Sequence, residues 1–189
     1  RWPWLVCMLT LPVSIIAMPV QAADLLFRAT YDSTVDADTA AGNGRATAGG
    51  SIQFFPGKSG RAIGLLPGAY LRYESADNLN PDEGSIALWI SPVVWTGDDA
   101  TDRFFVRILT DTGVMQLHKA GATRELRWSL LRHGSTTMPD APRQIIDWQP
   151  GEWHHVVVTW NRSRARLFVD GQLVGETHGA PLRSSFGRL

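Results

Sequence analysis

The chain has 189 residues, and its 18 Lys or Arg residues balance its 18 Asp or Glu residues, so the formal net charge is zero. That balance gives no overall basic field for binding nucleic acid. The length suffices for one domain that buries most of its apolar surface. The 18 glycines and 11 prolines lie among short apolar runs, which favours many short strands joined by turns.

The N-terminal segment differs from the rest of the chain. Residues 2–20 are apolar and uncharged, follow Arg1 and lead into Val-Gln-Ala at 20–22. A basic residue, an apolar stretch and small residues before the cut are typical of a secretory signal peptide. A membrane-spanning helix is the alternative, but its length would be marginal and three prolines interrupt it. We therefore expect residues 1–22 to be removed, and the remaining domain, 23–189, to be secreted, periplasmic or at the cell surface, with no membrane span.

The mature chain is a succession of short segments rich in β-branched and aromatic residues. No segment has the 3.6-residue apolar period of an amphipathic helix. The sequence therefore predicts an all-β fold, a two-sheet antiparallel sandwich. Strands are predicted at 25–30, 51–54, 62–65, 69–74, 85–92, 103–110, 114–119, 125–132, 143–146, 153–160, 164–169 and 172–177, with longer loops at 31–50, 95–102 and 134–142.

The most informative stretch is 148–176. Residues 153–160 and 164–169 are strong strand candidates, and in the second Ala165, Leu167 and Val169 share one face. Asp170-Gly171 predicts a type I′ hairpin turn, because both central positions of that turn need positive φ. The strand at 85–92 is apolar on both faces, which suits a central strand.

These segments carry a family resemblance. GEWHHVVVTW at 151–160, followed by RLFVDGQLVGE at 166–176, resembles the hallmark of laminin G-like domains in the concanavalin A-like lectin/glucanase superfamily. Segments 31–44, 57–62 and 85–90 resemble further family motifs in the same order. The resemblance implies a jelly roll with one concave and one convex sheet. Because the family continues with further strands after a segment like 186–189, we expect a fragment that lacks its last strand or strands.

Catalytic carboxylates are not predicted. Glucanases of this superfamily carry a Glu-x-Asp-x-x-Glu strand, whose alternate positions place two carboxylates on one face. The pattern is absent here, and the glutamates are isolated in the sequence. A glycanase or lyase relative with scattered catalytic carboxylates stays open as an alternative.

Two segments invite a metal interpretation. His154 and His155 are adjacent on a strand, so their side chains point to opposite faces and cannot close on one ion. The loop at 31–38 brings three carboxylates together in sequence, and calcium prefers such oxygen ligands. Many relatives hold a structural calcium beside the opening loop. We therefore expect a structural Ca²⁺ site with Asp32, Asp36 and Asp38, and the loop at 95–102 is the second candidate.

Sugar binding would use exposed aromatic faces and planar polar groups. Trp95 and Trp128 are the predicted stacking residues, with Arg127 and Arg132 as hydrogen-bond donors. Trp89, Trp153 and Trp160 are expected in the core, and Trp148 is expected to pack beside the turn at Pro150.

The alternating arginines at 162, 164 and 166 form a stripe on one strand face. They could bind an acidic polysaccharide through carboxylate or sulfate contacts, or they could form an ordinary solvated face.

The sequence thus favours an exported, non-catalytic binding module of a larger protein that recognises a glycan or an extracellular protein. A structural or adhesive spacer without its own ligand is the second hypothesis. Fold alone does not decide between them, because jelly rolls host both binding and catalysis.

Overall fold

A computed structural model gives the structure of residues 24–110, 113–132, 140–161 and 163–178. These residues contain only strands and loops, which confirms the all-β prediction. None of them forms a helix long and apolar enough to cross a membrane. The predicted signal peptide at 1–22 and the segment at 186–189 lie outside the described residues. The strands are β1 (Phe27–Arg28), β2 (Thr39–Ala40), β3 (Thr47–Gly49), β4 (Ile52–Pro56), β5 (Arg61–Leu65), β6 (Tyr70–Arg72), β7 (Gly84–Ile90), β8 (Arg103–Thr110), β9 (Gly113–Ala120), β10 (Glu125–Arg132), β11 (Asp140–Gln144), β12 (His154–Asn161), β13 (Arg164–Val169) and β14 (Gln172–His178).

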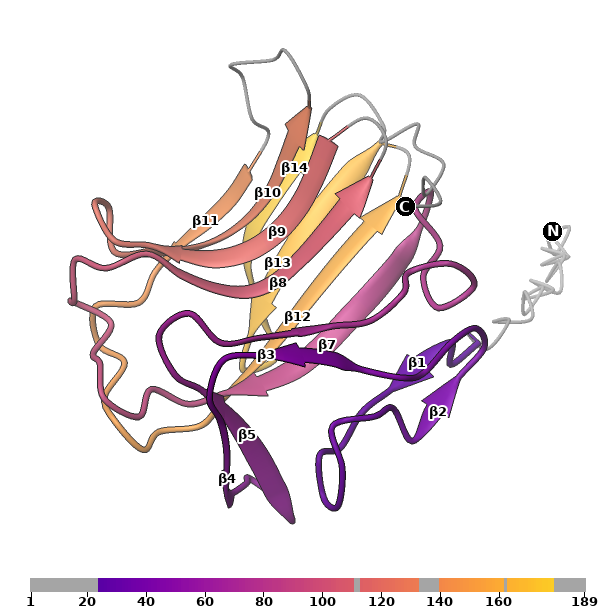
Figure 1. The fold of residues 1–189 in the computed structure, drawn as a ribbon. Coiled ribbons are helices and arrows are strands. Elements are labelled where there is room, and N and C mark those ends of the chain that lie inside the picture. The colour runs from indigo at the N-terminus through magenta and orange to yellow at the C-terminus, as the bar shows by residue number, and fades with distance from the viewer. Residues whose placement is uncertain (1–23, 111–112, 133–139, 162, 179–189) are drawn as a thin grey trace, which may run out of the picture.

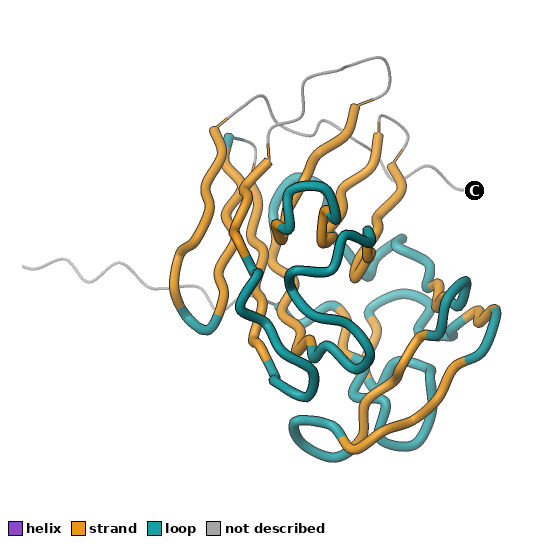
Figure 2. The backbone as a smooth tube through the Cα atoms, turned by 90° about the vertical axis from the view of Figure 1, so that its left-hand side faces the viewer, coloured by secondary structure: helices purple, strands orange, loops and turns teal. Residues whose placement is uncertain are grey.

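Two antiparallel sheets of four strands form the sandwich, in the orders β11-β10-β9-β8 and β14-β13-β12-β7. Figure 1 shows their strands running in similar directions, and the view in Figure 2 separates them into two layers. Alternate residues of each sheet point into the space between the layers. The buried core comes from both sheets and from the loops that flank them: Ile90, Trp95, Ile108, Met115, Leu117, Leu126, Trp128, Ile145, Trp148, Val156, Val158, Trp160, Ala165, Leu167 and Val169.

The β12–β13–β14 meander follows the sequence prediction closely. Ala165, Leu167 and Val169 are buried on one face of β13, as expected. Asp170 and Gly171 have φ values of 50° and 81°, which confirms positive φ at both central residues of the predicted turn. The local chemistry of this stretch was sufficient to define its strands and the turn between β13 and β14, whereas the register shift between Leu167 and Phe168 in the β13–β14 pairing was not predicted.

The N-terminal part contains short ladders that the sequence did not predict. The segment at 31–50, expected to be a loop, contains β2 and β3, which pair with β1 and β6. These strands have two or three residues each, so they are too short to show an alternation of apolar and polar residues. The β4–β5 hairpin lies where it was expected. Figure 1 shows this part of the chain on the side of the sandwich where β7 lies.

Two strands differ from their predicted places. β7 was expected to be central, but among the described residues it pairs only with β12 and ends its sheet. Its outward residue Trp89 is 46% exposed. The apolar residues on both faces of β7 therefore did not indicate that both faces are covered. β11 begins at Asp140, inside the predicted loop, and Pro142 is tolerated because β11 is an edge strand.

Candidate functional site

Neither tryptophan predicted to bind a sugar lies on the surface. Trp128 is fully buried, and its ring centroid lies 5.9 Å from that of Trp160. Trp95 is 9% exposed and packs 6.1 Å from the ring of Phe105. The prediction of exposed stacking rings is wrong, because Trp128 faces inward beside its partner Leu117 and Trp95 closes the end of the core. An indole in this position offers no open face to a sugar ring.

Of the remaining tryptophans, Trp89 and Trp153 differ from the prediction. Trp160 is buried, as expected, and Trp153 is half-buried. Trp148 is buried and stacks on His154, with 4.0 Å between the ring centroids and 6° between the planes. Trp89, expected in the core, stands on the outer face of β7, 4.9 Å from the ring of His155 and with Lys58 Nζ 5.2 Å from its own ring centroid.

Polar side chains instead gather on the outer face of the β8–β11 sheet, turned away from the other sheet. The pairing register aligns them in two rows across the strands. One row joins Phe104, His118 and Arg127, and the other joins Arg107, Gln116 and Ser129. Residues paired across antiparallel strands share a face, so each row presents its side chains together. We call the face formed by these two rows and Glu125 the polar face.

An exposed aromatic ring lies in the polar face. Phe104 is 49% exposed and stacks on His118, with ring centroids 5.5 Å apart and 19° between the planes. The guanidinium carbon of Arg107 lies 5.1 Å from the Phe104 ring centroid. Next to Arg107, Gln116 is only 6% exposed and Ser129 is fully buried. The Ser129 hydroxyl has no hydrogen-bond partner among the described residues, which is unusual for a buried polar group.

Arg127 and Glu125 form an ion pair at one end of this face. Nε of Arg127 lies 3.0 Å from Oε2 of Glu125, and one terminal nitrogen lies 2.5 Å from the same oxygen. Partial burial is the largest single influence on the pKa of Glu125 and raises it, but the hydrogen bonds from Arg127, Thr123 and Gln144 and the charge of Arg127 together hold the pKa below its ordinary value. Arg127 therefore lies on the polar face but is already paired with an acid. The other predicted donor, Arg132, ends β10, and its side chain lies outside the described part of the structure.

Most residues of the polar face were not singled out from the sequence, and a β-bulge explains why. The register shifts between Phe104 and Val106, so Phe104 and Arg107 share a face although they are three positions apart. In a regular strand those two positions would point to opposite faces. Only the cross-strand pairing reveals that they belong together.

The three carboxylates proposed for calcium do not converge on one point. Asp32 accepts a hydrogen bond from the backbone N–H of Arg61 (2.8 Å), Asp36 from Ala46 (2.8 Å) and Asp38 from Thr30 (2.6 Å). No group of three or more acidic, histidine or cysteine side chains in the described part of the chain could hold a metal ion. The predicted ligand set therefore does not fit one ion as it stands, and calcium binding itself stays a prediction.

The loop at 95–102, the weaker calcium candidate, closes the end of the core. Asp99 pairs with Arg103 (2.6 Å) and Asp98 with Arg124 (2.7 Å). Lys119 is fully buried, and its ammonium group donates hydrogen bonds to the carbonyl oxygens of Asp99 and Thr101. Burial lowers the pKa of Lys119, because the charged form loses its hydration. These carboxylates thus serve contacts within the protein.

The histidine pair divides between opposite faces, as strand geometry predicted. His154 packs on Trp148 rather than on Trp153 or Trp160, and its Nδ1 lies 2.9 Å from Oδ2 of Asp170. His155 lies on the outer face against Trp89. Because the two rings face different surroundings, they do not form a shared metal site.

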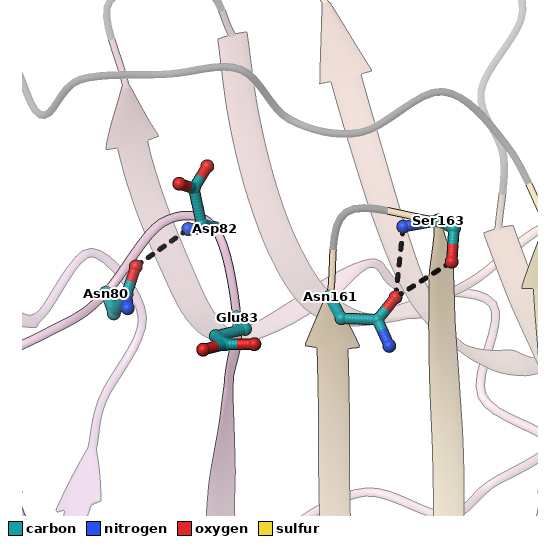
Figure 3. Close-up of a pocket in the computed structure, with 5 residues that line it drawn as sticks. All are labelled: Asn80, Asp82, Glu83, Asn161 and Ser163. Atoms are coloured by element: carbon teal, nitrogen blue, oxygen red, sulfur yellow. Dashed lines mark hydrogen bonds between the residues drawn. The ribbon is translucent and has the colours of Figure 1, made fainter.

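A small hollow lies where β7 begins and the turn between β12 and β13 passes (Figure 3). Its volume is about 390 Å³, and it is lined by Asn80, Asp82, Glu83, Asn161 and Ser163. The backbone N–H of Asp82 donates to the side-chain oxygen of Asn80 (2.9 Å), and that of Ser163 donates to Asn161 (3.0 Å). These side chains are polar, and none of them offers an aromatic ring for stacking.

Comparisons with known proteins agree with this architecture. A family model of the laminin G type, described as the concanavalin A-like lectin/glucanases superfamily, matches residues 67–187. No curated protein matches the chain significantly. Among solved structures, the chain is similar to domain 4 of AbnA, a GH43 extracellular arabinanase from Geobacillus stearothermophilus, in complex with arabinotriose. That similarity has a TM-score of 0.53 and 19% sequence identity, and it covers 76% of this chain and 68% of the other, so it shows the fold. The family model spans more than half of the chain, and the chain therefore belongs to the concanavalin A-like lectin/glucanases superfamily.

Proposed function

We propose that this chain is a non-catalytic carbohydrate-binding module of a larger exported protein and that it binds its glycan on the polar face. The observation that carries the proposal is the half-exposed Phe104 ring, flanked by the guanidinium group of Arg107, which Gln116 faces across the β8–β9 pair. A sugar ring stacks its C–H surface on an aromatic face, while planar polar groups bind its hydroxyls.

The comparisons support this proposal at a coarse level. The superfamily includes lectins, and the similar structure is a domain of an extracellular enzyme that was solved with a trisaccharide. Export of the present chain is part of the proposal and rests on the apolar segment at 1–22.

The state of Glu125 supports a binding role rather than catalysis on this face. A glycosidase needs a carboxylic acid whose pKa is raised so that it can protonate the leaving group. Glu125 has a lowered pKa and is bound by Arg127, which favours the charged form. This environment suits a carboxylate that positions Arg127 or accepts sugar hydroxyls.

The test begins with a glycan array that uses residues 23–189, followed by calorimetric titration with the oligosaccharides that bind. Phe104→Ala should weaken binding by about twofold to tenfold, since an aromatic stacking contact contributes about 0.5–1.5 kcal/mol. Trp89→Ala is the matched control, because Trp89 is an aromatic residue of similar exposure on the other sheet. If Trp89→Ala abolishes binding and Phe104→Ala does not, the polar face is not the binding site.

Two other functions remain as outcomes of this test. A chain that binds no glycan on the array would favour the spacer hypothesis. The hydrolase alternative has one specific observation in its favour, since Asp82 and Glu83 both line the hollow shown in Figure 3. Release of reducing sugar from a polysaccharide by the wild-type chain, lost in Glu83→Gln, would favour the hydrolase.

A further inference from the structure

The arginines on the strands of the two sheets differ in whether they pair with an acidic side chain. Five arginines of β8, β10 and β13 have described side chains, and four of them pair with an acid: Arg103 with Asp99, Arg127 with Glu125, and both Arg164 and Arg166 with Glu176. Arg107 makes no ion pair with a described residue. Among the side chains that the structure describes, its guanidinium group therefore has no acidic partner on the polar face.

The alternating arginine stripe does not offer the same opportunity. Oε1 of Glu176 lies 2.9 Å from Nε of Arg164 and 3.5 Å from Nε of Arg166. One carboxylate thus faces two of the stripe's guanidinium groups, and the third arginine, Arg162, lies outside the described residues. Glu176 therefore neutralises part of the positive charge of the stripe, which weakens the hypothesis that the stripe binds an acidic glycan. No described acid neutralises Arg107 in this way.

On the basis of the proposed function, we propose that the ligand is an acidic glycan in which a uronate carboxylate binds Arg107 while the same sugar ring stacks on Phe104. The guanidinium carbon of Arg107 lies 5.1 Å from the Phe104 ring centroid, so the cation and the ring form one small patch that a single sugar residue with an exocyclic carboxylate can contact. The planar guanidinium group binds a carboxylate through two parallel hydrogen bonds.

The surroundings of Arg107 indicate that this part of the face receives a polar partner. Gln116 on β9 and Ser129 on β10 follow Arg107 in the same cross-strand row, and both are more than nine-tenths buried. The Ser129 hydroxyl lacks a hydrogen-bond partner among the described residues. A buried donor without a partner is costly, so its presence beside a cation that has no described acidic partner favours a site that a ligand completes.

The experiment compares oligogalacturonides with neutral galacto-oligosaccharides of the same length by calorimetric titration. We expect the acidic series to bind about tenfold or more tightly at low salt, because a charge-assisted hydrogen bond contributes more than 1.4 kcal/mol. Added salt should reduce that preference. Arg107→Gln should remove the preference by weakening the acidic series much more than the neutral series, and Arg164→Gln, whose wild-type residue is paired with Glu176, is the matched control.

The outcomes separate this inference from the proposed function. Equal binding of both series, unaffected by Arg107→Gln, would overturn the acidic ligand and keep the carbohydrate-binding module. If the chain binds sulfated oligosaccharides but not oligogalacturonides, the inference that Arg107 binds a uronate carboxylate is wrong. A loss of preference in Arg164→Gln but not in Arg107→Gln would move the acidic site to the other sheet and overturn the inference. If no oligosaccharide binds, the proposed function itself fails.

Discussion

The indole rings of Trp128 and Trp160 meet between the two sheets, with their centroids 5.9 Å apart and their planes inclined by 38°. Trp128 belongs to β10 and Trp160 to β12, so the contact joins the sheets directly. Nε1 of Trp160 also donates a hydrogen bond to the carbonyl oxygen of Asn80 (3.2 Å). A residue that sequence reasoning assigned to ligand binding is therefore a central part of the core.

Replacing Trp128 should destabilise the fold strongly. Trp128→Ala leaves a large cavity between the sheets, and we expect a loss of about 3–5 kcal/mol in the free energy of unfolding, measured by urea denaturation. Trp89→Ala removes a half-exposed ring and should lower the free energy of unfolding by only about 1 kcal/mol or less. Similar losses in the two variants would contradict the burial described for Trp128.

Gly97 cannot carry a side chain in this fold. A Cβ atom at this position would lie 1.5 Å from the carbonyl oxygen of Ile145, and the N–H of Gly97 donates to the carbonyl of Trp148 (2.8 Å). Gly97→Ala should displace the loop and lower the melting temperature by many degrees. Gly151→Ala is the control, because it has positive φ but no atom within 4 Å of the added Cβ, and it should cost about 1 kcal/mol. A Gly97→Ala variant as stable as Gly151→Ala would contradict the close packing.

Asp170 ties the tip of the β13–β14 hairpin to the start of β12. Its two carboxylate oxygens lie 2.8 Å from the backbone nitrogen of His155 and 2.9 Å from Nδ1 of His154, and its φ is 50°. Asp170→Ala removes both contacts and disfavours the positive φ, so we expect a loss of about 2–3 kcal/mol in denaturant unfolding. Asp170→Asn keeps an acceptor and tolerates this backbone, and it should lose less. Equal losses would show that the turn conformation and remaining acceptor do not matter.

Acid should weaken the loop at 95–102 through Asp99. Hydrogen bonds from the backbone N–H of Thr101 and from Arg103 lower the pKa of Asp99 to about 2 from its ordinary 3.8. The folded state therefore binds this proton less readily than the unfolded state, so the stabilisation is present above about pH 4 and is lost as the pH falls toward 2. Asp99→Asn should be less stable than wild type at neutral pH, and the difference should shrink over that window. A difference that is constant from pH 6 to pH 2 would contradict this linkage; Asp147→Asn, which changes an exposed carboxylate, controls for the loss of one negative charge.

Calcium binding can be tested on the full chain without assuming a ligand set. If a structural calcium ion uses Asp32, calcium should raise the melting temperature, and Asp32→Ala should abolish that increase. The variant also loses the hydrogen bond to Arg61, so only the calcium-dependent increment is informative. An unchanged melting temperature in calcium and in chelator would remove the metal prediction.

The sequence by itself determined the fold class, most strands of the two sheets and the β13–β14 turn, because these depend on local chemistry. Alternating Ala165, Leu167 and Val169 specify which face of β13 is buried, and Asp170-Gly171 specifies the turn. Both features can be predicted without knowing what the chain packs against.

Only the tertiary structure decided which aromatic rings are buried and which polar groups meet. Trp128 and Trp89 both belong to strands with apolar neighbours, yet one lies between the sheets and the other on an outer face. Phe104 and Arg107 share a face because a bulge shifts the register of β8, and Gln116 and Ser129 join them through pairing across strands. The physical reason is that burial and register are set by partners distant in sequence, so the polar face comes into view only when the strands are paired.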